Sequence, residues 1–252
     1  MIEYIEIDGF GSISLYNLLI GIGVIFGLLL FENNNKKLPE RVKFKLYNIL
    51  FLSFIFGFLG ARISDLFFFS KAISINNLIY GSSTFMGGLM FAVIFSFIST
   101  TFARINFFYV INIFIPFIII SHVFGRLGCF FAGCCYGAET TNNFFLGVKF
   151  PVDSIPYFHY GDVIPIHPTQ LYESFGLIII LFLTKNKKNK ITPYLMYYGI
   201  LRFIIEFYRN DPRGGLLFDF FSPSQFLSIL FICLGLFVKW KYGRSTTRTT
   251  FL

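Results

Sequence analysis

The chain has 252 residues, of which 55% are hydrophobic and only 13% are charged. A soluble domain carries about 25% charged residues, so this composition excludes an ordinary soluble protein. The four cysteines are too few for a secreted scaffold held together by disulfides. The net charge of +8 does not call for a nucleic-acid partner, because most basic residues lie in the loops between apolar segments.

Seven apolar stretches approach the roughly 20 residues that a helix needs to cross a bilayer. Pro116 is expected to kink the fourth stretch without ending it. The sequence therefore predicts an all-α integral membrane protein, a bundle of seven transmembrane helices. In chain order the predicted spans are Leu15–Phe31, Leu46–Phe69, Thr84–Ala103, Phe107–Gly128, Thr169–Thr184, Ile191–Tyr208 and Pro223–Trp240.

The basic residues predict the orientation of these spans, because cytoplasmic loops accumulate Lys and Arg. Fourteen lie in segments on one side of the predicted bundle and four on the other. This alternation indicates an N-terminus outside and a C-terminus in the cytoplasm. We expect one membrane domain over residues 1–252, with an external loop at about 129–168 that contains extended segments or short amphipathic pieces.

Charged side chains inside predicted spans are costly and usually functional. Arg126 ends the fourth span, and Tyr198, Arg202 and Glu206 follow one another at i, i+4 and i+8 on one helix face. His167, Gln170 and Glu173 lie at the start of the fifth span. Two plainer interpretations stay open: Arg202 and Glu206 form a structural ion pair, and Arg126 reaches the lipid head groups.

Arg126 stands among glycines, in the stretch GRLGCFFAGCCYG. Glycine lets backbone approach a ligand closely, and a guanidinium binds phosphate oxygens in a bidentate fork. Gly125, Gly128 and Gly137 are therefore candidates for binding an anionic lipid head group beside Arg126. His122, four residues earlier, is interpreted as a hydrogen-bonded bundle residue and not as a base.

The cysteines of this stretch, Cys129, Cys134 and Cys135, allow four interpretations. They are a zinc site with a nearby histidine, a disulfide on the oxidising side, a reactive thiolate activated by Arg126, or small packing residues. The spacing does not decide among these interpretations. Cys233, in the middle of the last span, is interpreted as a packing residue.

Taken together, these motifs resemble the bacterial prolipoprotein diacylglyceryl transferases. GRLGCFFAGCCYG is similar to the family's central signature, HPTQLYES to its H-P-x-Q-L-Y-E motif, and YGILRFIIEFYRND to its Y-G-x-x-R-x-x-x-E-x-x-R segment. ARISDLFFF resembles an early Gly-x-Arg helix end, and ISLYNLL fits a tyrosine at the start of the first span. The motifs come in the family's order.

The resemblance implies transfer of the diacylglyceryl group of phosphatidylglycerol to the lipobox cysteine of a preprolipoprotein or a related exported acceptor. It implies no metal and no soluble cofactor, a place in the bacterial plasma (inner) membrane, and a monomer. By motif position, Arg126, Arg202, Glu206 and Tyr198 are the catalytic candidates. The substrate-binding candidates are Gly125, Gly128, Cys129, Cys134, Gly137, His167, Arg209, Tyr16 and Arg62.

Three positions depart from the family pattern. Met86 stands where the family has the histidine of an H-G-G motif, and a thioether cannot accept a proton. Cys129 replaces an asparagine of the signature, and Cys134 replaces its acidic residue. His167 and Glu206 are the candidates for a substitute base, and the two cysteines suggest a distinct subfamily with another acceptor or a thiol intermediate.

Two other functions stay open from the sequence alone. One is a membrane protein that binds or transports anionic lipid with the same arginines but catalyses nothing. The other is a membrane thiol oxidoreductase built on the cysteines.

Overall fold

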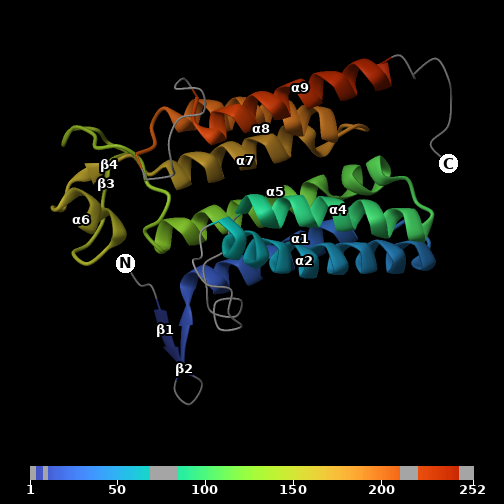
Figure 1. The fold of residues 1–252 in the computed structure, drawn as a ribbon, viewed down its shortest axis with the longest axis horizontal. Coiled ribbons are helices and arrows are strands. Elements are labelled where there is room, and N and C mark those ends of the chain that lie inside the picture. The colour runs from blue at the N-terminus through green and yellow to red at the C-terminus, as the bar shows by residue number, and fades with distance from the viewer. Residues whose placement is uncertain (1–3, 8–10, 69–84, 211–220, 244–252) are drawn as a thin grey trace. The chain divides into compact units, whose positions relative to one another are not determined.

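The structure, a computed structural model, describes residues 4–7, 11–68, 85–210 and 221–243. It is mostly helical, and each of the seven predicted spans coincides with a helix (Figure 1). The corresponding helices are α1 (Leu15–Asn34), α2 (Glu40–Phe68), α4 (Phe85–Ala103), α5 (Phe107–Phe131), α7 (Thr169–Lys185), α8 (Ile191–Glu206) and α9 (Pro223–Gly243).

Four of the helices in the described part of the chain, α1, α2, α5 and α9, are long and apolar enough to cross a membrane. They carry many exposed large apolar side chains; Phe26 on α1 and Trp240 on α9 are each more than half exposed. Such an apolar exterior fits contact with lipid. The chain is thus a helical membrane protein, and the number of spans and their orientation remain predictions.

The chain divides into two compact units, residues 35–113 and a second unit made of residues 1–34 and 114–252. In the smaller unit α2 packs against α4 through small residues. A Cβ atom added to Gly57 would lie 3.1 Å from the Cβ of Ala92, and one added to Gly88 would lie 3.1 Å from the Cβ of Ala61. Small residues of this kind let two membrane helices approach closely.

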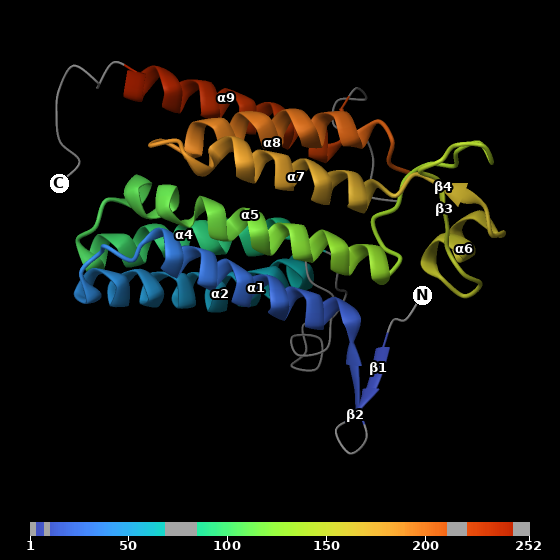
Figure 2. The same ribbon diagram turned by 180° about the vertical axis from the view of Figure 1, so that it is seen from behind.

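In the larger unit α7, α8 and α9 lie side by side in both views (Figures 1 and 2). Helix α1 packs against α5, with Gly23 against Phe124 and Gly27 against Phe117. Pro116 lies inside α5, which continues through it. An antiparallel hairpin of β1 (Tyr4–Ile7) and β2 (Gly11–Ser14) precedes α1.

The segment between α5 and α7 has its own small core. Strands β3 (Val148–Lys149) and β4 (Pro165–Ile166) pair antiparallel, and the short helix α6 (Ile155–Tyr160) lies between them in sequence. Tyr136, Phe150 and Ile166 form a buried cluster. Helix α5 runs on to Phe131, so Cys129, predicted at the start of the loop, belongs to the last helical turn, and the loop begins at Ala132.

Candidate functional site

Glu173 is the centre of a polar cluster inside the larger unit. Its side chain is 0% exposed, and its Oε1 atom lies 3.0 Å from Arg126 Nη2 and 3.5 Å from His122 Nε2. The hydroxyl of Tyr198 donates a hydrogen bond to the same oxygen at 2.9 Å. One buried carboxylate therefore holds a guanidinium, an imidazole and a phenol around it.

Helical periodicity brings these groups together from three helices. His122 and Arg126 are four residues apart on α5, so they lie on one face. Glu173 projects from α7, which is tied to α5 by a buried hydrogen bond from Ser174 Oγ to the Val123 carbonyl at 3.1 Å. Tyr198 comes from α8, and its ring meets the His122 ring edge to face at 5.3 Å.

A second ion pair lies one turn further along α8. Arg202 Nη2 is 2.7 Å from Glu206 Oε2, and both side chains are less than a tenth exposed. The same Nη2 atom donates to Ser224 Oγ at 2.8 Å, and Ser222 Oγ donates to Glu206 Oε1 at 2.7 Å. The start of α9 therefore holds both members of the pair in place.

Both arginines keep buried donors that the described residues do not engage. Arg126 Nε and Arg202 Nη1 are buried and have no hydrogen-bond partner within the described part of the chain, and the same is true of Glu173 Oε2. A buried donor without a partner costs about 1–3 kcal/mol, more for a charged group. Such atoms are expected where a polar or anionic ligand completes the hydrogen bonding.

The signature stretch follows directly after this cluster, because α5 ends in a glycine cap. The amide of Cys134 donates to the Cys129 carbonyl at 3.1 Å, and that of Gly133 donates to the Phe130 carbonyl at 3.1 Å. Gly133 has φ of 66°, so this is a Schellman motif with glycine in the left-handed conformation. The motif turns the chain back toward the last turn of α5.

The start of α7 then holds the returning chain. Gln170 Nε2 donates to the Cys134 carbonyl at 2.6 Å, and Thr169 Oγ1 donates to the Cys135 carbonyl at 2.8 Å. Gln170 and Thr169 are almost completely buried. The motif HPTQLYES thus supplies Glu173 to the polar cluster and also anchors the backbone of the cysteines.

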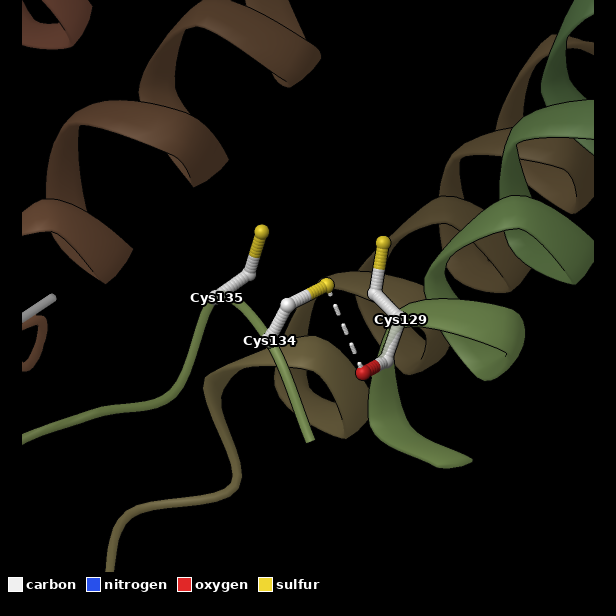
Figure 3. Close-up of side chains that lie close together, drawn as sticks. All are labelled: Cys129, Cys134 and Cys135. Carbon is white, nitrogen blue, oxygen red and sulfur yellow. Dashed lines mark hydrogen bonds between the residues drawn. The ribbon is translucent and has the colours of Figure 1, made fainter. Parts of the chain in front are cut away.

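The three cysteines lie together as free thiols (Figure 3). Their sulfur atoms are all within 4.8 Å of one another, and Cys134 Sγ lies 3.7 Å from the Cys129 carbonyl oxygen. Hydrogen bonds from the thiols of Cys129 and Cys134 lower the pKa of Cys135, and the charges of Arg209 and Arg126 lower this pKa further. The three thiols therefore form one cluster at the end of α5.

Gly137 joins the end of the signature to two other predicted site residues. Its amide donates to the His167 carbonyl at 2.9 Å, and its backbone pairs with Arg209 in an isolated β-bridge. A Cβ atom at position 137 would lie 2.5 Å from the Tyr208 carbonyl oxygen and 2.6 Å from His167. Glycine is therefore required here by close backbone approach.

The side chain of His167 lies in an aromatic setting. Its Nδ1 is 3.0 Å from the Tyr172 hydroxyl, and its ring packs edge to face on Tyr208 and Phe144. Partial burial lowers the pKa of His167 from its ordinary value.

The remaining predicted residues fall into two groups. Gly128 packs against Tyr16 of α1, whereas no described atom lies within 4 Å of where a Cβ of Gly125 would stand. Arg62 belongs to the smaller unit, where its guanidinium lies 5.5 Å from the centre of the Phe58 ring. Met86 belongs to α4, but its side chain lies outside the described residues.

Two residues of the cluster were not among the predicted site residues. Glu173 was recognised as a charged group at the start of a span, but its partnership with two other helices has no signature in sequence spacing. His122 was interpreted as a bundle residue. The i, i+4 spacing of His122 and Arg126 was the signal that could have linked this histidine to the site.

Comparison with known proteins places this arrangement in a family. The family model of the prolipoprotein diacylglyceryl transferases matches residues 3–241. The phosphatidylglycerol–prolipoprotein diacylglyceryl transferase 2 of Clostridium perfringens is 34% identical over 240 residues, 87% of each chain. The corresponding proteins of Clostridium tetani and Rickettsia bellii are 29% and 30% identical, over 88% and 90% of this chain and 90% of each relative.

Proposed function

Because the chain belongs to the prolipoprotein diacylglyceryl transferase family, we propose that it transfers the diacylglyceryl group of phosphatidylglycerol to a cysteine thiol of an exported prolipoprotein. The names of its relatives include phosphatidylglycerol and prolipoprotein. The observation that carries the proposal for this chain is the buried pair of arginines, Arg126 and Arg202, with hydrogen-bond donors left over.

The reaction exchanges a phosphate ester bond for a thioether bond. The acceptor sulfur attacks the glyceryl carbon that carries the phosphate, and the carbon–oxygen bond breaks. The bonding electrons stay on the phosphate oxygen, so glycerol phosphate leaves with an additional negative charge, and the thiol proton passes to a base. Positive groups fixed in a water-poor site stabilise the developing charge, and Arg126 and Arg202 are the groups suited to that role.

The polar cluster suggests how the arginines are held ready for this step. Glu173 fixes Arg126 from one side, and Tyr198 fixes Glu173. Glu206 and Ser224 orient Arg202. In this proposal, Tyr198 and Glu206 position the guanidinium groups of Arg126 and Arg202. These two groups contact the phosphate.

His122 is our candidate for the base, in place of the family histidine that Met86 replaces. Its ring contacts both Glu173 and Tyr198, one helical turn from Arg126 on α5. In this role the neutral imidazole takes the thiol proton of the acceptor. His167, with its phenol partner, is the weaker candidate because nothing described joins it to the arginines.

The substrate-binding roles follow the position of each residue in the site. The open space at Gly125 and the close backbone contacts of Gly128 and Gly137 suit a lipid backbone lying along the signature. The other substrate-binding candidates near this stretch are Cys129, Cys134, His167, Arg209 and Tyr16, whereas Arg62 remains a candidate by motif position alone. These assignments stay part of the proposal.

The proposed setting is the bacterial plasma membrane, which the chain crosses seven times as a single domain. The N-terminus and the loop at about 129–168 would lie outside, where an exported acceptor is available, and the C-terminus would lie in the cytoplasm. The basic loops support this orientation. The proposed active species is a monomer.

The test uses purified protein in detergent, phosphatidylglycerol with a labelled head group, and a lipobox peptide. We expect release of labelled glycerol phosphate and a peptide mass gain of one diacylglyceryl unit. Arg126→Ala should lower the rate by about 100- to 1,000-fold, as removal of one charge-stabilising group does elsewhere. His122→Gln should lower it by about 100- to 10,000-fold, the usual contribution of a general base.

Arg41→Ala is the matched control, because Arg41 is an exposed arginine of α2 and should leave the rate unchanged. Lipid binding without release of glycerol phosphate would overturn the proposal in favour of a lipid-binding or transporting protein. Full activity of the Arg126→Ala variant would remove the arginine from the mechanism.

A further inference from the structure

In the transfer reaction proposed above, the three clustered thiols act neither as the base nor as charge-stabilising groups. Cys129 belongs to the last turn of α5, and Cys134 and Cys135 lie on the chain that the Schellman motif turns back (Figure 3). Among the described residues, these three are the one group of His, Cys, Asp and Glu side chains arranged to hold a metal ion. Cys233, on α9, lies outside the group and is exposed.

The distances between the sulfur atoms match a three-coordinate metal site. A metal–thiolate bond of about 2.3 Å places three sulfur atoms in a plane around one ion at about 4 Å from one another. The three Sγ atoms lie within 4.8 Å of one another. Rotation about the Cα–Cβ bonds moves the sulfur atoms without moving the backbone.

The backbone around the thiols is held from several directions. The carbonyls of Cys134 and Cys135 accept the hydrogen bonds of Gln170 and Thr169, at 2.6 and 2.8 Å. Cys135 has φ of 64°, a conformation uncommon for a residue with a side chain. These constraints hold three sulfur atoms close to one point, as pre-formed ligand sets do.

We propose that Cys129, Cys134 and Cys135 bind one thiophilic d10 metal ion through three thiolates, with Cu(I) as the best match. Thiolates select soft ions such as Cu(I) and Zn²⁺. Structural zinc takes four protein ligands and catalytic zinc takes three with a water, whereas three thiolates alone complete the three-coordinate site of Cu(I). Binding replaces thiol protons by the metal, with no oxidation or reduction.

This inference differs from the metal-free expectation that the family resemblance carries, and its test measures metal binding and not transferase activity. It also differs from a disulfide, which joins two sulfur atoms and leaves the third out. The mutual proximity of all three sulfur atoms, within 4.8 Å of one another, is the observation that favours a metal ion over a disulfide.

The experiment titrates Cu(I), without oxygen, into the reduced full-length protein in detergent, in competition with a chromophoric chelator. We expect one Cu(I) ion per chain and release of protons on binding. Zn²⁺ and Cd²⁺ are titrated in separate experiments. Binding of Cd²⁺ should give the ultraviolet charge-transfer band of a thiolate complex. Cu(I) should bind more tightly than Zn²⁺.

Each of the variants Cys129→Ser, Cys134→Ser and Cys135→Ser should weaken Cu(I) binding by more than about 10-fold, since even outer-shell changes cost about 10- to 100-fold. Cys233→Ser is the matched control and should bind like the unaltered protein. The melting temperature without metal, measured for each variant, shows whether it is folded.

Two results would overturn the proposal. One is unchanged Cu(I) binding when all three clustered cysteines are serine. The other is a fully reduced, folded protein that takes up no Cu(I), together with loss of two thiols on exposure to air, which would assign the cluster to a disulfide.

Discussion

The Glu173 carboxylate lies at the point where Arg126, His122 and Tyr198 meet, and it is completely buried. Removing one member of a buried ion pair leaves the other charge without compensation in a medium of low polarity. Glu173 is therefore expected to matter for the folded state as well as for the reaction, since it keeps the guanidinium of Arg126 in position.

For the Glu173→Gln variant we expect a loss of about 3–5 kcal/mol of stability, because the Arg126 charge loses its buried partner. The measurement is the thermal unfolding midpoint in detergent, with circular dichroism as the signal. Glu139→Gln makes the same chemical change at an exposed loop position and should leave the midpoint nearly unchanged. Equal midpoints for the two variants would contradict a structural role of the Glu173 charge.

A pH effect is expected at His167, whose pKa burial lowers below the ordinary value of 6.5. The folded state then favours the neutral ring. This preference stabilises the folded state fully above pH 6.5, and the stabilisation is lost as the pH falls from 6.5 through the lower pKa of the folded state. His167→Gln should reduce the fall of the unfolding midpoint below pH 6.5. Identical pH profiles for both proteins would show that His167 does not contribute.

At the scale of single elements, the end of α5 shows how local rules position the site. The helix stops at a glycine with φ of 66°, and this stop turns the two later cysteines back toward the first. Gly125, inside the same helix, has no described neighbour within 4 Å of the point where a Cβ atom would stand. The two glycines, one inside α5 and one just after its end, therefore serve different purposes.

Alanine substitution should separate these purposes. Gly133→Ala should cost about 1–2 kcal/mol, since a side chain is disfavoured in the left-handed conformation. Gly125→Ala should be neutral or stabilising by up to about 1 kcal/mol, because alanine favours the helix. Unfolding midpoints of the two variants measure the difference. A larger loss for Gly125→Ala would mean that position 125 is more tightly packed than its described neighbours indicate.

Apolar runs in the sequence predicted every long helix of the described chain, with ends within several residues. The largest difference is at the start of α2, which begins at Glu40 where the predicted span begins at Leu46. Helix α5 likewise continues to Phe131, beyond the predicted end at Gly128. A predicted span follows apolar residues alone, whereas a helix continues until a residue such as Gly133 ends it.

At the scale of the whole molecule, the distribution of basic residues predicts which loops face the cytoplasm. Single cysteines placed in a cysteine-free background test this prediction. An impermeant maleimide added to intact cells should label Asn142→Cys, in the loop after α5, and should not label Lys37→Cys or Lys188→Cys. All three positions are exposed. Labelling of Lys37→Cys or Lys188→Cys in intact cells would reverse the proposed orientation.

Residue composition and motifs were sufficient to predict the helical membrane class, the positions of the helices and the family. Composition and apolar run length carry this information because the bilayer admits few backbone structures and penalises each charge within it. Motif order was sufficient for the family.

The partners of most buried charges emerged only from the packing of the helices. Arg202 and Glu206 are one helical turn apart, so spacing predicted their pairing. Arg126, Glu173 and Tyr198 come from three helices, and the three thiols meet only because one glycine turns the chain back. Contacts of this kind depend on how helices pack, which residue spacing along a single helix does not specify.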